Sequence, residues 1–274
     1  MNFINETLSF LQSAGVQSEF LSFIEIELNK NGTINQTVKS SLMSGSNVNI
    51  ESNPHVKCLL IFALLDCWID SNFTELEGDS YRKKYEKLPS NSENNLIIRE
   101  VFRLLKVLRN TVVHNPSQFL FDNKKLTIDY KFKNTDYTLT IPESTLNNIY
   151  TIVILCIKEK TKNKYFWGVI RSAYLDVINS IQSFSDDFKT SLYYEEKGFE
   201  IRPYMRYRVK NAKIERYDGY FAITIPTTHS QHLQPYMGVD FYLDVDGHKY
   251  LVPKEGLTSG CILQERDLHH WKVS

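Results

Sequence analysis

Residues 96–116 read LIIREVFRLLKVLRNTVVHNP, and this stretch predicts the helix on which the fold depends. Apolar residues recur three and four positions apart, as on the buried face of an amphipathic helix. They are Ile97, Ile98, Val101, Phe102, Leu104, Leu105 and Leu108. The helix is expected to end at His114, because Asn115 precedes a proline and is therefore pushed out of the helical region.

A second apolar helix is predicted upstream, in residues 52–73, which read SNPHVKCLLIFALLDCWIDSNF. Asn53 is a suitable N-cap and Pro54 suits the first helical position. The run behind them is apolar almost all round, which indicates a central place in a bundle. Asp66 interrupts this run, and a buried carboxylate needs a partner.

The other N-terminal segments predict a bundle that carries one small hairpin. Residues 3–28 indicate two short helices or one broken near a glycine, and the polar residues 29–53 indicate a loop. Residues 124–141, KKLTIDYKFKNTDYTLTI, alternate apolar and polar side chains around KNTD, which is typical of a hairpin. Another helix follows, so residues 1–160 are expected to form a helical bundle.

The character of the sequence changes after Tyr193. Residues 161–192 continue as a connecting helix that could belong to either part of the chain. Residues 193–274 are rich in Tyr, Phe and Val, with turn signals at YDG and VDG, and predict a β-rich C-terminal region. The expected fold class is α+β.

Composition limits the partners and the compartment. The 274 residues include 32 Lys and Arg balanced by 32 Asp and Glu, so a nucleic-acid partner would need a local basic patch. The four cysteines form no CxxC pair, which favours free thiols over a disulfide framework or a zinc site. No secretory signal and no run long enough to cross a bilayer is present, which predicts a cytoplasmic protein without a membrane partner.

The end of the 96–116 helix carries the motif that suggests a function. Residues 109–114 read RNTVVH, a pattern that resembles the R-x(4–6)-H motif of the HEPN family, in which a polar residue commonly follows the Arg. The resemblance covers about residues 54–160. It implies an HEPN-like helical bundle, a homodimer with a composite cleft, and a toxin or antiphage defence effector that cleaves RNA. It also implies a possible antitoxin or other defence-system protein as a partner.

These residue types suit metal-independent RNA cleavage. The 2′-hydroxyl of RNA can attack the adjacent phosphorus, and His114 could take up or supply the protons because histidine titrates near neutral pH. Arg109 suits the negative charge of the phosphorane, and Asn110 could orient the phosphate or the imidazole. The need for a 2′-hydroxyl makes RNA the expected partner, and no cofactor is expected.

Helical geometry opposes a simple version of this site. Five residues turn an ideal helix by about 500°, which leaves Arg109 and His114 roughly 140° apart. Either the helix unwinds at His114, or two copies of the motif face each other in a symmetric homodimer. The structural alternative is a histidine that interacts with the helix dipole and an arginine that pairs with a carboxylate.

Two acidic residues compete as partners of Arg109. HEPN proteins often carry a polar or acidic residue on an earlier helix, and Asp66 is the candidate for that role in this chain. Asp70, one turn later, is the competing candidate. The alternative is that Asp66 lies on a narrow solvent-facing or dimer-facing stripe.

A second candidate RNA-binding element lies in the C-terminal region, in IRPYMRYRVK. Alternation assigns Arg202, Tyr204, Arg206, Arg208 and Lys210 to one strand face. Such a face can follow a phosphate chain and stack a base, or it can be the solvated side of a half-buried sheet. No metal is expected at the histidine pairs 229/232 and 269/270, because neither shows a tetrahedral ligand set.

Three functions remain open from the sequence, and one of them, which the HEPN resemblance implies, is a nucleotide-transferase partner or an antitoxin-like component. The first is a metal-independent endoribonuclease of HEPN type, with Arg109, Asn110, His114 and Asp66 as the catalytic set. The alternative is a non-catalytic HEPN-like module that dimerises and binds a ligand or a partner protein, since fold does not secure activity.

Overall fold

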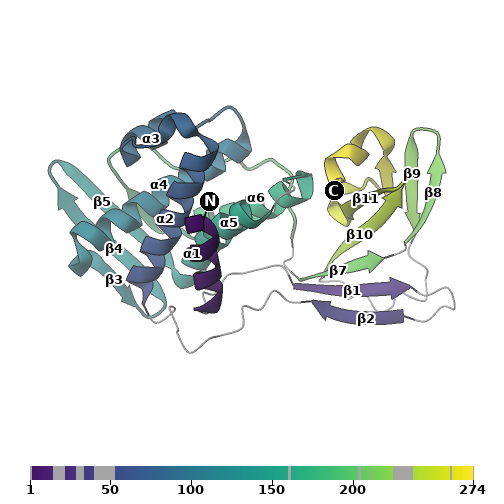
Figure 1. Cartoon of the computed structure of the whole chain (residues 1–274), viewed down its shortest axis with the longest axis horizontal. Helices are drawn as coiled ribbons and strands as arrows, with labels where there is room; N and C mark the ends of the chain where they lie inside the picture. Colours follow the sequence, from purple (N-terminus) through teal and green to yellow (C-terminus); the bar gives the residue numbers. More distant parts are fainter. Residues whose placement is uncertain are drawn as a thin grey trace. The chain divides into compact units, whose positions relative to one another are not determined.

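The computed structural model describes residues 2–14, 22–28, 34–39, 53–159, 162–202, 205–210, 212–224, 237–259 and 261–273. The protein is mixed α+β (Figure 1). It divides into two compact units. Unit 1 comprises Met1–Glu19, Met43–Lys158 and Ala173–Lys197, and unit 2 comprises Phe20–Leu42, Glu159–Ser172 and Gly198–Ser274. The predicted boundaries 1–160, 161–192 and 193–274 differ from this division, because an N-terminal segment belongs with the C-terminal strands.

The helices of unit 1 match the prediction in part: the helix expected after Asn53 begins there, the helix expected from residue 96 begins at Glu93, and the helix at residues 81–87 was not predicted. They are α1 (Asn2–Ser13), α2 (Pro54–Asn72), α3 (Tyr81–Lys87), α4 (Glu93–His114) and α5 (Glu143–Lys158), with 3-10 turns η2 (Thr74–Leu76) and η3 (Pro116–Gln118). Asn53 caps α2, since its side-chain oxygen accepts a hydrogen bond from the N–H of Val56 at 3.1 Å. Ser92 caps α4 in the same way through the N–H of Asn95 at 3.3 Å. Both caps satisfy donors that an isolated helix end leaves unpaired.

Helix α4 is the buried centre of unit 1. The predicted apolar face is confirmed, with Val101, Phe102 and Leu105 completely inaccessible to solvent. Burial of each such side chain stabilises the fold by about 1.5–3 kcal/mol. The opposite face is buried as well, because the side chains of Arg103 and Lys106 are almost inaccessible to solvent. Arg103 donates to Asp186 at 2.6 Å and Lys106 donates to Asp187 at 2.5 Å.

Unit 1 also contains a four-stranded antiparallel sheet, so a helical bundle with one small hairpin is an incomplete description of it. The strands β3 (Phe119–Asp122), β4 (Lys125–Phe132), β5 (Thr135–Pro142) and β6 (Ser183–Ser185) lie in the order β3-β4-β5-β6. The predicted hairpin is β4–β5, with Tyr130 opposite Tyr137. Strand β6 comes from the segment predicted as connecting helix, whose helical part, α6 (Lys164–Ser180), ends earlier than expected.

Unit 2 is built from two sheets. The five-stranded sheet has the order β11-β10-β7-β1-β2, and the three-stranded sheet has the order β12-β9-β8. The strands are β1 (Ser22–Leu28), β2 (Ile34–Lys39), β7 (Met205–Lys210), β8 (Lys213–Tyr217), β9 (Tyr220–Thr224), β10 (Gly238–Val245), β11 (His248–Pro253) and β12 (Ile262–Gln264), with 3-10 turns η4 (Lys254–Gly256) and η5 (Glu265–Trp271).

The two N-terminal strands of this sheet correct the sequence prediction. Residues 3–28 contain one helix, α1, followed by β1, and the expected loop over residues 29–53 contains β2. Strand β1 pairs antiparallel with the nearby β2 and in parallel with β7, so one of its two hydrogen-bonding neighbours lies far away in the sequence. Its residues SFIEIEL alternate, which places Ile26 in the core and Glu27 in solvent.

No helix in the described part of the chain is long and apolar enough to cross a membrane. Over the same residues, no cluster of three or more His, Cys, Asp or Glu side chains could hold a metal ion. The four cysteines are free thiols, as predicted.

Candidate functional site

The C-terminal end of α4 is shaped by the residues that stop the helix. Asn115 leaves the helical region with φ of −141°, while its N–H still donates to the carbonyl of Thr111 at 2.8 Å. Pro116 then starts a 3-10 turn that leads into β3. The last helical residue, His114, is exposed, whereas Arg109 and Asn110 are half-buried.

The side chains of Arg109 and His114 meet at this end. Nη1 of Arg109 lies 3.3 Å from Nε2 of His114, and the same Nη1 donates to Oδ1 of Asn110 at 3.1 Å. The roughly 140° between the two helical positions is overcome by the length of the arginine side chain, which reaches along the helix to the last turn. Neither unwinding before His114 nor a second copy of the chain is needed to bring the two groups together.

A hydrogen bond between Arg109 Nη1 and His114 Nε2 requires one particular tautomer of the histidine. Arginine carries only donors, so Nε2 of His114 must act as the acceptor in this hydrogen bond. A hydrogen bond of this kind requires the tautomer of His114 that carries its proton on Nδ1. A neutral imidazole with a lone pair on Nε2 is the form that can take up a proton.

An aromatic cluster anchors the guanidinium. The Cζ atom of Arg109 lies 5.2 Å from the ring centre of Tyr81, at the start of α3. Tyr81 in turn contacts the rings of Phe62 and Phe102 edge to face. No carboxylate within the described residues lies at ion-pair distance from Arg109. The guanidinium is therefore held in place by packing against Tyr81 and by Asn110, and no carboxylate among the described residues neutralises its charge.

Asp66 pairs with a lysine instead of with Arg109. Lys84 of α3 lies 2.6 Å from Asp66 and 2.6 Å from Asp70, and its side chain is only 3% exposed. Burial raises the pKa of Asp66; Lys84 opposes the rise strongly and Arg109 opposes it weakly. The predicted direct pairing with Arg109 is therefore corrected to a longer-range interaction, because Lys84 occupies the position between the two carboxylates.

The hairpin contributes two tyrosines that the sequence prediction missed. Tyr130 and Tyr137 stack with ring centres 5.1 Å apart. Burial raises the pKa of Tyr130, and the side chains of Thr111 and Asn115 at the end of α4 oppose that rise. Tyr130 thus borders the helix end that carries His114. The only signal in the sequence was their symmetric spacing about KNTD, which places them opposite each other across the hairpin.

The strand face predicted to bind RNA, here called the basic stripe, consists of Arg202, Tyr204, Arg206, Arg208 and Lys210. These residues lie in different surroundings in unit 2. Arg206 is completely buried: it donates to Asp240 at 2.8 Å and to Glu255 at 2.7 Å, so it is a structural ion pair and not an RNA contact. Arg202 is exposed and pairs with Glu200 at 3.0 Å. Tyr204 lies outside the described residues.

Two members of the stripe keep the predicted orientation. Arg208 and Lys210 share a face of β7 and line a pocket. A nearby glycine explains why Arg206 can be buried beside them, since a Cβ on Gly238 would lie 2.3 Å from its guanidinium.

The histidine pairs do not build a metal site in the described part of the chain. His229 and His232 lie outside it. The rings of His269 and His270 are 3.8 Å apart, and burial followed by the charge of His269 lowers the pKa of His270. Comparison with family models, with curated proteins and with solved structures gave no match to this chain. The resemblance to the HEPN family therefore stays a prediction from the sequence motif.

Proposed function

We propose that unit 1 is a metal-independent endoribonuclease of HEPN type, with its reaction centre at the C-terminal end of α4. One observation carries the proposal: the 3.3 Å approach of Arg109 Nη1 to His114 Nε2, with Asn110 bound to the same guanidinium nitrogen. A phosphodiester beside this pair would present a phosphate oxygen to the guanidinium, which donates, and its 2′-hydroxyl to the imidazole, which accepts. The charge on Arg109 is free of carboxylates in the described residues, so it is available to an anion.

The proposed reaction uses the substrate's own nucleophile. Substrate binding turns the N–H of Arg109 from Nε2 of His114 to a phosphate oxygen. The 2′ oxygen of RNA then bonds to phosphorus while the freed Nε2 of His114 takes up the 2′ proton. Arg109 stabilises the negative charge that develops on the phosphorane. The bond from phosphorus to the 5′ oxygen then breaks, and that oxygen receives a proton from an imidazolium or from water. The products are a 2′,3′-cyclic phosphate and a 5′ hydroxyl.

Other residues are assigned supporting roles. Asn110 holds the guanidinium in place through the 3.1 Å bond to its Oδ1. Asp66 and Lys84 support the same region from α2 and α3 and are positioning residues, since neither touches the Arg–His pair. In a symmetric homodimer a second His114 could supply the proton that the leaving oxygen needs.

The proposal is tested by RNA cleavage in EDTA. Arg109→Ala and His114→Ala should each lower the cleavage rate by about 10²–10³-fold, the range for removing one charge-stabilising donor or one acid–base group. His248→Ala is the control, because this exposed histidine lies at the start of β11 in unit 2. Cleavage products should end in a cyclic phosphate. A wild-type chain that is folded but cleaves no RNA would contradict the proposal.

A biological role follows from the resemblance. We propose a toxin or an effector of antiphage defence, which would arrest growth by cleaving cellular RNA. Expression of the wild-type chain should then arrest growth, and expression of the Arg109→Ala and His114→Ala variants should not. A partner that suppresses this effect would be an antitoxin or another protein of the same defence system.

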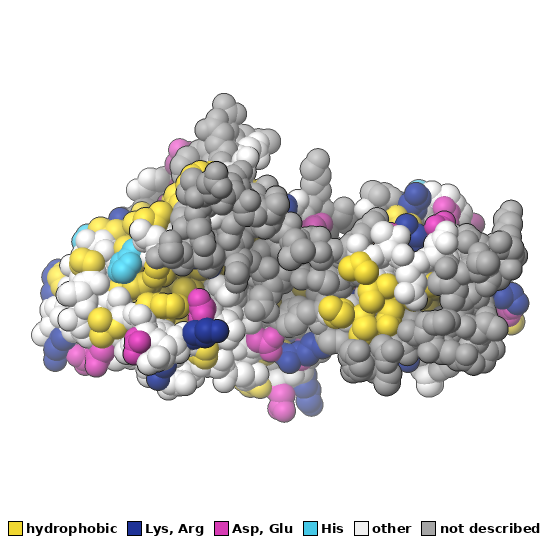
Figure 2. Space-filling model, turned by 90° about the horizontal axis from the view of Figure 1, so that it is seen from below, with side chains coloured by type: hydrophobic (Ala, Val, Ile, Leu, Met, Phe, Trp, Pro, Cys, Tyr) yellow, Lys and Arg dark blue, Asp and Glu magenta, His cyan; other side chains and the backbone are white. Residues whose placement is uncertain are grey.

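A second candidate function is a non-catalytic module that dimerises or binds a partner. Exposed apolar side chains near the end of α4 favour it: Val113 is 43% exposed, Leu120 is 56% exposed and Phe121 is 37% exposed. Figure 2 shows hydrophobic side chains gathered beside histidine on this unit. Exposed apolar groups of this kind mark interfaces. An intact dimer without cleavage would select this function over the first.

A further inference from the structure

The five-stranded sheet of unit 2 has one apolar face and one charged face. Ile26 and Tyr207 lie in the core on one side. On the other side, register places Lys210 of β7 opposite Tyr242 of β10, and Asp244 of β10 opposite Lys249 of β11. Alternate residues of a strand point to the same face, so these polar side chains share one surface.

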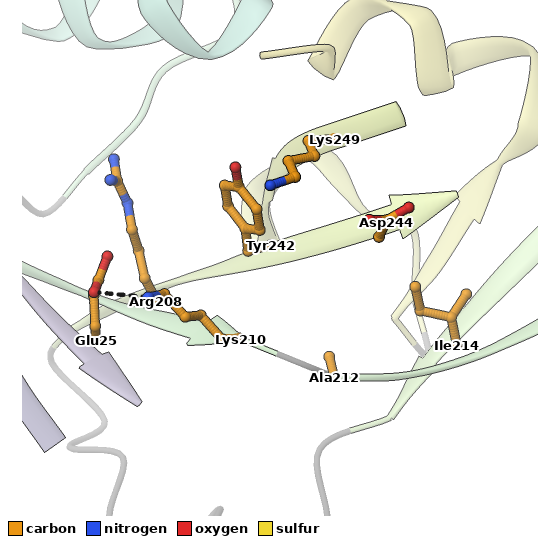
Figure 3. Close-up of a pocket in the computed structure, with 8 residues that line it drawn as sticks. All are labelled: Glu25, Arg208, Lys210, Ala212, Ile214, Tyr242, Asp244 and Lys249. Atoms are coloured by element: carbon orange, nitrogen blue, oxygen red, sulfur yellow. Dashed lines mark ion pairs between the residues drawn. The ribbon is translucent and has the colours of Figure 1, made fainter. Parts of the chain in front are cut away.

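A pocket of about 640 Å³ opens on this charged face. Figure 3 shows its polar lining, which consists of Glu25, Arg208, Lys210, Tyr242, Asp244 and Lys249. In this view Arg208 and Lys249 flank Tyr242 on its two sides. All of these residues belong to unit 2, so the pocket is complete within one compact part of the chain.

Neighbouring carboxylates neutralise part of the positive charge around the pocket. Lys210 pairs with Glu25 at 3.1 Å. Arg208 lies 4.0 Å from Asp240, and Asp240 is also bound by the buried Arg206.

Lys249 and Asp244 are different. They face each other across β10 and β11, yet no ion pair joins them, and neither has an ion pair elsewhere among the residues that the structure describes. The pocket therefore presents an available ammonium group, an available carboxylate and, between the cations, the half-buried ring of Tyr242.

We propose that this pocket binds a nucleotide, through its phosphate and its base together. Lys249 and Arg208 would hold the phosphate by charge-assisted hydrogen bonds. The base would lie against the ring of Tyr242, where stacking is favourable for any base. Asp244 would accept an N–H of the base or a hydroxyl of the ribose. The same chemistry is offered by a free nucleoside monophosphate and by one nucleotide of a single-stranded RNA.

Size and chemistry favour a nucleotide over smaller ligands. Pockets for ligands of drug or cofactor size measure about 300–1,000 Å³, and this pocket falls in that range. Inorganic phosphate would use the cations and leave Tyr242 and Asp244 without a contact. An amino acid would pair with Lys249 and Asp244 but would leave most of the volume empty.

Calorimetric titration of the full chain tests the proposal. The probes are the four ribonucleoside monophosphates, inorganic phosphate, the four nucleosides and a single-stranded RNA hexamer. At least one monophosphate, or the hexamer, should bind more tightly than inorganic phosphate and than the nucleosides. Lys249→Ala should weaken that binding by about tenfold or more, the usual loss for a hydrogen bond to a charged group. Tyr242→Leu should weaken it by about tenfold.

The control is Lys254→Ala, which removes an exposed lysine of the same unit that does not line the pocket. Binding of a monophosphate assigns the pocket to a free ligand, and binding of the hexamer alone assigns it to RNA; both support the proposal. It is overturned if no nucleotide binds at millimolar concentration, if phosphate binds as tightly, or if Lys249→Ala and Tyr242→Leu bind like wild type. Because no cleavage is measured, this outcome is independent of the activity proposed for unit 1.

Discussion

Arg109 in unit 1 and Arg206 in unit 2 were both predicted to contact RNA, and their surroundings assign them opposite roles. Arg206 is fully buried, with Asp240 and Glu255 bound to its guanidinium. Arg109 is half-buried against Tyr81, and its hydrogen-bonding neighbours are the uncharged Asn110 and His114. Whether the charge is neutralised therefore decides whether an arginine is available to a ligand.

The comparison shows what separates a structural cation from a candidate functional one. A buried guanidinium must be paired, because a charge left alone in the interior costs several kcal/mol. A half-buried guanidinium held by a ring and an amide meets no such requirement, since water still solvates one side. Arg103 in unit 1 repeats the pattern of Arg206: it is fully buried and bound to Asp186 by two hydrogen bonds of 2.8 and 2.6 Å.

The largest expected effect is on the stability of unit 2. Arg206→Ala should lower its free energy of unfolding by about 3–5 kcal/mol, because it leaves two carboxylates without their partner. Arg109→Ala should cost only about 1–2 kcal/mol, the loss of one cation–π contact and two hydrogen bonds of a half-buried side chain. Urea unfolding of the two variants measures the difference. Equal losses of stability would show that both arginines are structural, and would contradict the assignment of Arg109 as available to a ligand.

Substitution of Lys84 should have an intermediate effect on the free energy of unfolding, and it tests how the region around Arg109 is held together. Lys84→Met keeps most of the side-chain volume but leaves Asp66 and Asp70 facing each other, so the free energy of unfolding should fall by about 1–3 kcal/mol. The triple variant with Asp66→Asn and Asp70→Asn should recover part of that loss. Urea unfolding gives both values. If Asp66→Asn alone abolished RNA cleavage without loss of stability, Asp66 would belong to the reaction centre and not to its support.

The smallest effect concerns alkaline stability in unit 1. Burial is the largest cause that raises the pKa of Tyr85 and of Tyr137 to about 12 from the ordinary value of 10.0. Between these two values the unfolded chain loses protons that the folded chain keeps, so the free energy of unfolding falls as pH rises from about 10 to about 12. Below pH 10 the contribution is complete.

Urea midpoints measured at several values in this range should show the decline, and Tyr137→Phe should make it shallower. Tyr194→Phe is the control, because this tyrosine is 52% exposed. A decline of the same steepness in Tyr137→Phe and in the control would remove Tyr137 from the explanation.

Local signals in the sequence predicted the elements that depend on neighbouring residues. Asn53 and Pro54 start α2, and Asn115 with Pro116 ends α4, because caps and prolines act on the nearest turn. The hairpin around KNTD was predicted for the same reason. Strand β1 was missed, since residues 20–28 also fit a helical spacing and one of its two neighbours, β7, comes from a remote part of the sequence.

The site was predicted in part. Arg109, Asn110 and His114 were found from their motif, but a helical wheel treats side chains as short and could not predict that Arg109 reaches His114. The burial of Arg206 depends on Asp240 and Glu255, which are 34 and 49 positions away along the chain. The role of Lys84 was missed, because nothing in its own helix indicates two carboxylate partners on α2.

The insertion of β1 and β2 into a sheet completed by β7 has a consequence for synthesis on the ribosome. Strand β7 leaves the ribosome roughly 180 residues after β1, which at about 5–20 residues per second is a delay of roughly ten to forty seconds. During that interval the nascent chain carries a strand whose parallel neighbour does not yet exist. We expect chaperones to engage this N-terminal segment, and we expect a fragment starting at residue 193 to be insoluble, because it lacks two strands of its own sheet.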